Sequence, residues 1–424
     1  DNISGLLREP SLEEYVSSKS KNNITGYFMQ IGIDDFEEIN GRFGLKCGDE
    51  ILKQFSRCMQ SCINENQKIY ELGNGRFIIM DLANHTKEDI LELYDELKKS
   101  VEVALEESDY RIVYTISVGI VEIDKEMKDY DTLIKYSEFA LNEAKKKGKN
   151  SCYFFTQDKY KQFIRRREIR VGLQNAVDHN FNNFDVYYQP IIDIHTRNLI
   201  GAEALMRFKM KRNEQIEFVS PAEFIPILEE SGLIIPTGRW ILRQAVACCK
   251  KWQEFIPEFK VNVNLSYVQI IKSRILDEIK QALKDYNLKP ALLGIEVTES
   301  GYLENTYHYK KLWSSLKEEG ITLVLDDYGT GYSNAYRLSN LTPHYIKIDR
   351  VLTQKALSSN YERSILIYII EMAHSLKLNV CIEGVETEEE LQEIKKLNPD
   401  YIQGYLFGKP APEDEFYNRQ IKKK

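Results

Sequence analysis

The first 156 residues mix the two periodicities that distinguish strands from helices. Hydrophobic and polar residues alternate, as in half-buried strands, over residues 25–33, 68–81 and 111–122. The spacing typical of amphipathic helices occupies residues 35–64, 86–106 and 130–147. This order predicts an α+β domain with an antiparallel sheet over residues 1–156. Residues 157–175, rich in Lys and Arg with helical spacing, are predicted to form a linker helix.

From residue 176 to residue 424 the pattern changes to short β-branched runs separated by helical stretches. The runs are residues 185–194, 198–208, 259–266, 293–300, 322–329, 345–350, 379–384 and 401–407. Such a series of strands and helices predicts an α/β fold, the TIM or (β/α)8 barrel. Only residues 195–197 join the first two runs, which is too short for a parallel crossover. We therefore predict a modified barrel with an antiparallel first strand.

Composition and charge narrow the class of protein. Acidic residues (65) outnumber Lys and Arg (57), and the net charge of −8 has the wrong sign for coating a nucleic-acid polymer. The seven cysteines form no CxxC pair and are predicted to be reduced, cytosolic thiols. Hydrophobic runs are too short to span a membrane, and the chain opens with Asp1. We expect a cytoplasmic protein, or the cytoplasmic part of a longer, membrane-anchored one.

Polar residues recur near the ends of the second to eighth predicted barrel strands, where barrel enzymes carry their active sites. They are Glu203, Arg207, Asn264, Glu296, Glu299, Asp326, Asp327, Lys347, Asp349, Glu383, Glu386 and Gln403. A single carboxylate of this kind is usually a helix cap. Several converging carboxylates require cations, and oxygen ligands favour Mg²⁺, Mn²⁺ or Ca²⁺ over zinc. The adjacent Asp326 and Asp327 suggest two ions that share a carboxylate, an arrangement suited to phosphate ester hydrolysis.

Lys347 has an alternative interpretation, because a lysine on a barrel strand can form a Schiff base with a carbonyl substrate. Schiff-base chemistry needs a lowered lysine pKa, whereas neighbouring carboxylates keep a lysine protonated. We therefore predict that Lys347 acts as a cation that orients the nucleophile or a phosphoryl oxygen. The segment 327–334, with Gly329 and Gly331, is predicted to be a mobile loop beside the site.

Seven short motifs carry a family resemblance in their order and spacing. They are Glu203-Ala204-Leu205, Asn264-Leu265-Ser266, Glu296-Val297-Thr298-Glu299, Asp326-Asp327-Tyr328-Gly329-Thr330-Gly331, Lys347-Ile348-Asp349, Glu383-Gly384-Val385-Glu386 and Gln403-Gly404. Residues 176–424 thereby resemble the EAL phosphodiesterases. The resemblance implies hydrolysis of cyclic di-GMP to linear pGpG with two Mg²⁺ or Mn²⁺ ions. It also implies a homodimer formed through this domain.

The resemblance assigns a role to each matching residue. The ligands of one ion would be Glu203, Asn264, Glu296 and Asp326, and those of the other Asp326, Asp327 and Glu383. Lys347 would position the nucleophilic water, Glu383 would also be the general base, and Glu299 would anchor the loop at 327–334. Asp349, Glu386 and Gln403 would support the metal waters. The substrate contacts would be Gln189, Leu205, Arg207 and Gln403, with Arg207 at a phosphate.

Three positions depart from the family pattern without removing a ligand. Tyr328 stands where phenylalanine is usual, and Asn334 replaces a serine. Ile382 replaces an alanine beside Glu383, where we expect it to crowd the second ion.

Residues 1–156 resemble the GGDEF family, which condenses two GTP molecules into cyclic di-GMP. The resemblance lies in residues 1–7, 34–48 and 144–150, whereas the signature itself reads Gly73-Asn74-Gly75-Arg76-Phe77. Gly32 replaces a metal-binding aspartate of the family and Glu37 a phosphate-binding lysine, so metal-dependent phosphoryl transfer is not expected. Asn40 and Asp49, which match the guanine-reading pair of the family, remain.

We therefore expect a degenerate GGDEF domain that regulates or dimerises, with GTP as a candidate ligand, or that is only a structural relic. For residues 176–424 the leading hypothesis is a cyclic di-GMP phosphodiesterase. The alternative is a receptor that binds cyclic di-GMP without cleaving it. A cyclase or bifunctional enzyme conflicts with the broken signature.

Overall fold

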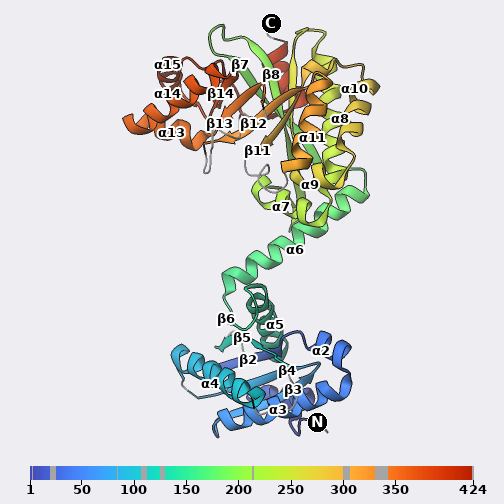
Figure 1. Cartoon of the computed structure of the whole chain (residues 1–424), viewed down its shortest axis with the longest axis vertical. Coiled ribbons are helices and arrows are strands. Elements are labelled where there is room, and N and C mark those ends of the chain that lie inside the picture. The colour runs from blue at the N-terminus through green and yellow to red at the C-terminus, as the bar shows by residue number, and fades with distance from the viewer. Residues whose placement is uncertain are drawn as a thin grey trace. The chain divides into compact units, whose positions relative to one another are not determined.

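The computed structural model describes residues 1, 3–19, 25–83, 85–106, 112–124, 129–212, 214–298, 306–329 and 342–422. The chain divides into two compact units, Asp1–Arg165 and Arg166–Lys424 (Figure 1). The division falls within helix α6 (Gln157–Asp178). Each unit is described by itself. Among the described residues, none of the helices combines the length and apolar character needed to cross a bilayer.

The first unit is built on a sheet with strand order β1-β3-β4-β2-β5-β6. The strands are β1 (Leu7–Arg8), β2 (Gly26–Ile33), β3 (Gln67–Gly73), β4 (Arg76–Asp81), β5 (Ile116–Ile123) and β6 (Cys152–Phe154). The helices are α1 (Glu9–Lys19), α2 (Phe36–Phe43), α3 (Leu45–Cys62), α4 (Lys87–Glu106) and α5 (Tyr130–Lys146). Strand β2 pairs antiparallel with β4 and β5, which confirms the predicted α+β class.

Two hydrophobic clusters on opposite faces of this sheet explain why β2 is buried along its whole length. One cluster joins the sheet to α3 and α4, and the other joins it to α1 and α5. The single helix predicted at 35–64 is interrupted, because Gly44 adopts a φ of +87° between α2 and α3. A backbone angle of this sign cannot continue a right-handed helix and favours glycine.

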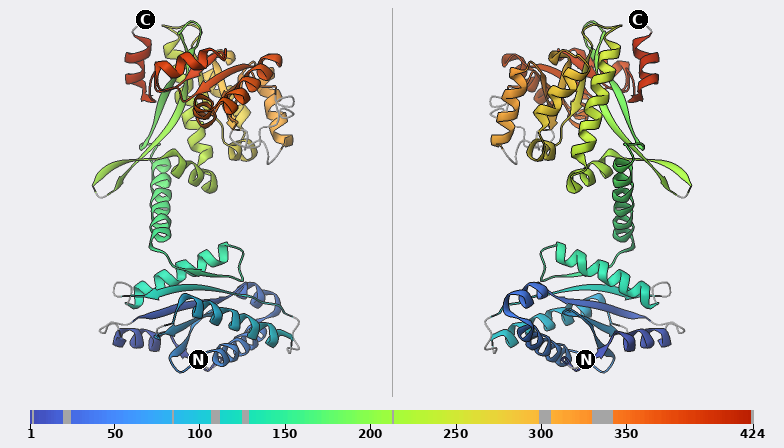
Figure 2. Two further views of the ribbon diagram at one scale, coloured as in Figure 1. Left: turned by 90° about the vertical axis from the view of Figure 1, so that its left-hand side faces the viewer. Right: turned by 90° about the vertical axis from the view of Figure 1, so that its right-hand side faces the viewer.

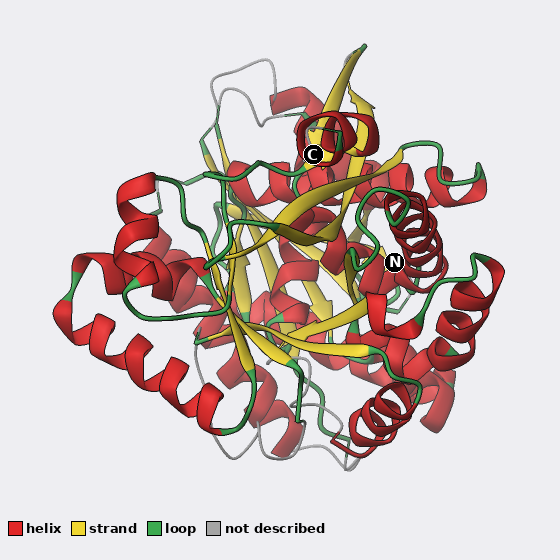
Figure 3. Cartoon of the chain, turned by 90° about the horizontal axis from the view of Figure 1, so that it is seen from above, coloured by secondary structure: helices red, strands yellow, loops and turns green. Residues whose placement is uncertain are grey.

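The second unit contains a closed barrel of eight strands with helices outside it (Figure 3). Its strands are β7 (Phe184–Asp193), β8 (Leu199–Arg212), β10 (Lys260–Asn264), β11 (Leu293–Thr298), β12 (Thr322–Tyr328), β13 (Tyr345–Ile348), β14 (Asn379–Glu383) and β15 (Tyr401–Gln403). Strand β7 pairs antiparallel with both β8 and β15, whereas the other neighbours are parallel. The predicted barrel with an antiparallel first strand is therefore confirmed.

Helices and two extra strands complete this unit. The helices are α7 (Pro221–Ser231), α8 (Ile234–Trp252), α9 (Tyr267–Lys272), α10 (Ile275–Asp285), η1 (Pro290–Leu292), α11 (Thr306–Glu318), α13 (Arg350–Ser358), α14 (Asn360–Ser375), α15 (Glu388–Lys395), α16 (Glu413–Phe416) and η3 (Tyr417–Ile421). Strand β9 (Gln215–Val219) extends β8 into a hairpin that projects from the barrel (Figure 2), and β16 (Ala411–Pro412) pairs with β7. The sequence pattern did not predict this hairpin.

The main core lies between the barrel strands and their helices. A second, small cluster fills the interior of the barrel on the side of the amino-terminal ends of the parallel strands. Ile191, Val324, Tyr345 and Cys381 form the bore cluster. Alternate residues of a strand face opposite sides, so the same strands supply both cores. The bore is therefore packed below the strand ends that carry the polar residues.

Candidate active site

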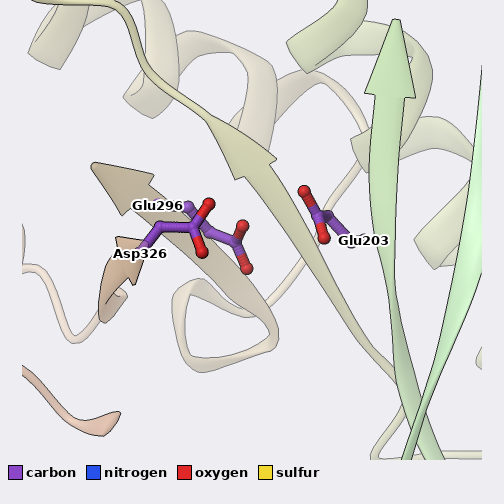
Figure 4. A group of neighbouring side chains, drawn as sticks. All are labelled: Glu203, Glu296 and Asp326. Carbon is purple, nitrogen blue, oxygen red and sulfur yellow. The ribbon is translucent and has the colours of Figure 1, made fainter. Parts of the chain in front are cut away.

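A buried lysine surrounded by four carboxylates lies at the carboxyl ends of the barrel strands. The Nζ atom of Lys347 lies 2.8 Å from Glu203 Oε2, 3.1 Å from Glu296 Oε2, 3.3 Å from Asp326 Oδ1 and 2.7 Å from Glu383 Oε1. The Lys347 side chain is 1% exposed. Glu203, Glu296 and Asp326 point toward one another from β8, β11 and β12 (Figure 4). The structure thus brings together the carboxylates expected from the strand pattern.

Amide side chains hold Glu203 in place. Asn264 Nδ2 donates to Glu203 Oε1 at 2.7 Å, and Gln403 Nε2 donates to Glu203 Oε2 at 2.7 Å. The same Gln403 nitrogen lies 3.1 Å from Gln189 Oε1, which places both glutamines beside the carboxylates. These bonds fix the orientation of Glu203 and partly replace the water lost on burial.

The carboxylates form two groups that share Asp326. One comprises Glu203, Glu296 and Asp326, the other Asp326, Asp327 and Glu383, and the oxygen atoms within each group lie within 4.8 Å of one another. Oxygen donors at such spacing suit a hard divalent cation. Asp326 Oδ1 is buried, and within the described part of the chain its partner is the Lys347 ammonium at 3.3 Å, as expected of an oxygen that faces positive charge. The residues present therefore fit the two ions expected from the sequence.

A local irregularity lets two adjacent aspartates serve one site. The pairing of β12 with β13 shifts register between Leu325 and Tyr328, and Asp327 adopts a φ of +55°. In a regular strand, Asp326 and Asp327 would point to opposite faces. The bulge turns Asp327 so that both carboxylates reach the same group. Aspartate is one of the few residues that tolerate this backbone region.

Burial and mutual repulsion shift the pKa values of the acidic side chains by different amounts and in different directions. Burial, reinforced by Asp326 and Glu203 and opposed by Lys347, raises the pKa of Glu383 to about 8. Burial and the charge of Asp326 raise the pKa of Asp327 to about 6. For Glu203, burial acts upward, but Lys347 and the amide donors outweigh it and lower the pKa.

The pKa values of Glu296 and Lys347 are both raised, but for different reasons. Burial and the charge of Glu203 raise the pKa of Glu296 well above its ordinary value. Burial acts to lower the pKa of Lys347, yet the surrounding carboxylates raise it. Lys347 is therefore a permanent cation at neutral pH, which disfavours a Schiff-base role.

The carboxylates open onto a cavity of about 720 Å³. Its lining includes Leu205, Arg207, Asn264, Asp326 and Asp327. The guanidinium of Arg207 lies 5.4 Å from the ring centroid of Tyr187 and donates to the backbone oxygen of Met206 at 2.9 Å. Leu205 and Arg207 thus lie where a ligand bound over the carboxylates would touch them. The volume is in the range of small-molecule sites.

Two predicted residues, Asp349 and Glu386, contact groups outside the carboxylate cluster. Asp349 caps α13, its Oδ1 accepting from Val351 N at 2.7 Å, although its charge still contributes to the raised pKa of Asp327. Glu386 pairs with Arg350 at 2.7 Å on the exposed side of the strand ends. Glu299 and residues 330–334 of the expected loop lie outside the described residues.

The structure corrects the expected effect of Ile382. Cys381 belongs to the cluster in the bore, and Ile382 belongs to the cluster between strands and helices. Ile382 therefore faces away from Glu383 and does not crowd the second group of carboxylates. Strand alternation fixes this outcome, because neighbouring residues of β14 face opposite sides.

A polar layer beneath the carboxylates was missed in the sequence analysis. Asn262 Nδ2 donates to Glu296 Oε1 at 2.6 Å and also to the hydroxyl oxygen of Tyr345. Asn262 lies two residues before Asn264, and Tyr345 lies two residues before Lys347. The period of two would have placed both side chains on the inward face.

The first unit has a smaller cavity, of about 530 Å³, where the GGDEF signature falls. Asn74 and Gly75, with φ of +52° and +69°, form the turn between β3 and β4. Arg76 points toward Glu138, with Nη1 3.3 Å from Oε1, and pairs across the sheet with Gly32. The metal-binding position of the family thus carries a guanidinium here.

The expected guanine-reading residues lie nearby on α2 and α3. Asn40 is partly buried, and its Oδ1 accepts no hydrogen bond within the described part of the chain. Asp49 lies on α3, next to Gly48, which packs against the Asn40 side chain. Lys145 lines the cavity, and Lys149 pairs with Asp35 at 2.6 Å.

Comparison with known proteins identifies both units. The profile described as EAL domain matches residues 170–410. The chain belongs to the EAL domain family. The profile described as diguanylate cyclase, GGDEF domain matches residues 2–151, so a GGDEF domain and an EAL domain follow each other in tandem.

Curated relatives are similar to this chain over nearly its whole length. The signaling protein YkoW of Bacillus subtilis is 32% identical over 399 residues, which cover 93% of this chain and 48% of YkoW. The cyclic di-GMP phosphodiesterase PdeR of Escherichia coli is 28% identical over 435 residues, which cover 100% of this chain and 64% of PdeR. The chain thus spans less than two thirds of either relative.

Solved structures resemble the EAL domain. The PaMucR phosphodiesterase, in complex with c-di-GMP, has a TM-score of 0.55 and 28% identity, covering 59% of this chain and 99% of that chain. The EAL domain of FimX from Pseudomonas aeruginosa, bound to c-di-GMP, has a TM-score of 0.52 and 25% identity, covering 57% of this chain and 96% of that chain.

Proposed function

We propose that this chain is a metal-dependent phosphodiesterase that hydrolyses cyclic di-GMP to linear pGpG. The observation that carries the proposal is the pair of carboxylate groups sharing Asp326 around Lys347. The names of the similar proteins support the substrate, since PdeR is a cyclic di-GMP phosphodiesterase and the PaMucR structure is a c-di-GMP complex.

In this proposal Glu203, Asn264, Glu296 and Asp326 would hold one Mg²⁺ or Mn²⁺ ion, and Asp326, Asp327 and Glu383 would hold the second. Two such ions supply the positive charge that lets water attack a phosphodiester near neutral pH. Asn262 and Gln403 orient Glu296 and Glu203 by the hydrogen bonds described above.

Lys347 and Glu383 are proposed to have two further roles, holding the attacking water and accepting its proton. The Lys347 ammonium is buried and permanently charged, so it holds the attacking water and stabilises charge on the phosphoryl oxygens. Glu383 would be the general base once metal binding has removed its proton, because its Oε1 lies 2.7 Å from the Lys347 ammonium that would hold the water. Asp349 and Glu386 would act from outside the carboxylate groups by supporting the metal waters, and Glu299 would anchor the loop at 327–334.

The cavity beside the carboxylates would receive the cyclic dinucleotide. Arg207 offers a guanidinium to a phosphate, a pairing that is strong when partly desolvated. Leu205 supplies an apolar contact from the same strand, while Gln189 and Gln403 offer amide groups beside Glu203. These residues would set affinity for the substrate more than the rate of cleavage.

The GGDEF domain is proposed to be a degenerate, regulatory module without cyclase activity. Arg76 and Gly32 stand where acidic ligands of the family would hold metal. Lys145, which lines the cavity, together with Asn40 on α2 and Asp49 on α3, would allow GTP to bind without turnover. A homodimer through the EAL domain fits the large apolar side chains exposed on α13 and α14, namely Val351, Tyr361 and Tyr368.

A chromatographic time course tests this function. Purified protein is incubated with cyclic di-GMP and Mg²⁺ or Mn²⁺, with an EDTA control and a parallel incubation with GTP alone. We expect metal-dependent formation of pGpG and no cyclic di-GMP from GTP. Intact substrate that nonetheless binds would instead make the chain a receptor, and synthesis from GTP would contradict the degenerate GGDEF domain.

A further inference from the structure

A second cavity lies at the opposite end of the barrel from the carboxylates. It measures about 580 Å³ and is lined by residues at the amino-terminal ends of the parallel strands. Lys260 begins β10, Thr322 begins β12, Asn379 begins β14 and Tyr401 begins β15. Tyr345 and Asn262 form the wall between this cavity and the carboxylates, because both line the cavity and Asn262 donates to Glu296 on its other side.

The charge around this cavity is one-sided in a protein whose net charge is −8. Lys260, Lys317, Lys377 and His344 line it, and its described lining residues include no carboxylate. Lys260 and Lys377 have no salt-bridge partner within the part of the chain that the structure describes, while Lys317 Nζ donates to Thr342 Oγ1 at 3.0 Å. Three ammonium groups around one concavity give it a positive potential that favours an anion.

The acidic residues closest to Tyr401 are already engaged. Asp193 accepts hydrogen bonds from the backbone of His195 and Thr196, and Asp400 Oδ2 accepts from Val380 N at 2.8 Å. Asp400 also lies 3.0 Å from His374 Nε2. These carboxylates are held by the turns of the barrel and do not neutralise the lysines of the cavity.

Besides the lysines, the cavity is lined by a neutral histidine ring, an amide side chain and two tyrosine rings. Leu323 N donates to His344 Nδ1 at 2.9 Å, which leaves Nε2 as the protonated nitrogen of the neutral ring. Burial and the charges of Lys317 and Lys260 lower the pKa of His344, so the ring is neutral at pH 7. Tyr345 and Tyr401 pack edge to face with centroids 5.6 Å apart, and Asn379 Nδ2 donates to the Tyr401 hydroxyl at 2.9 Å.

We propose that this cavity is a binding site for a small phosphate-bearing molecule. Lysines are compact cations suited to phosphate oxygens, and several converge here without a competing carboxylate. The volume exceeds what the phosphates alone would fill, and the tyrosines with Leu376 and Leu378 offer apolar surface for an attached organic group. A nucleoside diphosphate and inorganic pyrophosphate share the chemistry that the lysines recognise.

Calorimetric titration of the whole chain tests the proposal. Inorganic pyrophosphate and ADP are titrated separately in EDTA, without divalent ions, so that binding through metal at the carboxylates is avoided. The double variant Lys260→Ala/Lys377→Ala removes two exposed rim cations and leaves the core untouched. Lys284→Ala, an exposed lysine of α10 that does not line the cavity, is the matched control.

We expect one saturable site in the parent, weakened at least about tenfold in the double variant and unchanged in Lys284→Ala. Binding should also persist in Arg207→Ala and Arg76→Ala, which remove cations at the other two cavities. Tighter binding of ADP than of pyrophosphate would mean that the nucleoside contributes, and equal binding that the phosphates suffice. No saturable binding at millimolar ligand, or binding that survives the double variant, would overturn the proposal. Equal melting temperatures of the variants confirm that folding is intact.

Discussion

The Nζ atom of Lys347 lies 2.7 Å from Oε1 of Glu383, at the centre of four carboxylates. A cation so placed balances part of the acidic charge when no metal is present. It also brings a proton donor and a proton acceptor to the same point at the strand ends. This arrangement explains why the carboxylates can remain together in a low-dielectric barrel, and it has consequences that can be measured.

Replacing Lys347 with methionine should distinguish its contribution to stability from its contribution to turnover. Lys347→Met keeps the side-chain length and leaves four buried or partly buried carboxylates without their cation. We expect the metal-free protein to lose on the order of 3 kcal/mol of unfolding free energy in urea. Mn²⁺ should restore most of this stability but not turnover, because the ions replace the charge and not the position of the ammonium. Unchanged stability in EDTA, compared with Lys284→Met, would contradict the assignment.

The metal-free protein should become less stable as pH rises toward 8. The folded protein keeps a proton on Glu383 up to about pH 8, whereas the ordinary pKa is 4.5. Deprotonation in this interval therefore costs folding free energy, by about 2 kcal/mol between pH 6 and pH 8. Glu203, with its lowered pKa, and Lys347, with its raised pKa, keep their charges throughout and add no slope.

Urea unfolding in EDTA at pH 6, 7 and 8 measures this dependence. Glu383→Gln should reduce it, because the amide cannot titrate, whereas Glu296 and Asp327, whose pKa values are also raised, keep part of the slope. Saturating Mn²⁺ should remove it in the parent, since metal binding requires the deprotonated carboxylates and becomes tighter as pH rises. A stability that increases between pH 6 and pH 8 without metal would be incompatible with a protonated Glu383.

The buried Asn262 should control metal affinity from below the ligands. Its Nδ2 donates to Glu296 Oε1 at 2.6 Å, so Asn262→Ala frees Glu296 to rotate. Loss of such a supporting bond typically weakens a metal site about 10- to 100-fold. Mn²⁺ titration would show this weakening, with a smaller effect in Tyr345→Phe, which leaves the amide in place. Equal Mn²⁺ affinity in Asn262→Ala and the parent would exclude this role.

Arg207 and Glu203 should affect turnover in different ways. Arg207→Ala removes a phosphate contact and should mainly raise KM, because the carboxylates and Lys347 are unaffected. Glu203→Ala removes a proposed ligand and should abolish turnover. Steady-state kinetics with Mg²⁺ distinguishes the two. Substantial activity in Glu203→Ala would contradict the two-ion assignment.

Much of the fold could be predicted from the sequence, because barrel strands are short runs of β-branched residues and the lengths of their connections limit how they pair. The runs of β-branched residues predicted the strands, and the three-residue link at 195–197 predicted the antiparallel start. Inward residues near strand ends converge by geometry alone, which is why Glu203, Glu296 and Asp326 could be expected to meet.

Other features depended on packing that sequence alone does not reveal. The bulge at Asp327 reorients one side chain against strand alternation. The layer formed by Asn262 and Tyr345 could have been placed on the inward face by strand alternation, but its hydrogen bond to Glu296 depends on the register between strands. The break between α2 and α3 at Gly44 was not predicted, because the hydrophobic spacing typical of a helix continues on both sides of it.

The number of Mn²⁺ ions bound per chain tests the central claim most directly. Equilibrium titration at pH 8 should give two ions in the parent and one in Asp327→Asn, which removes a ligand of only one group. Asparagine tolerates the same backbone angle, so the bulge is preserved. Asp326→Asn, which alters the shared ligand, should weaken both. One ion in the parent, or two undiminished ions in Asp327→Asn, would contradict the shared-carboxylate site.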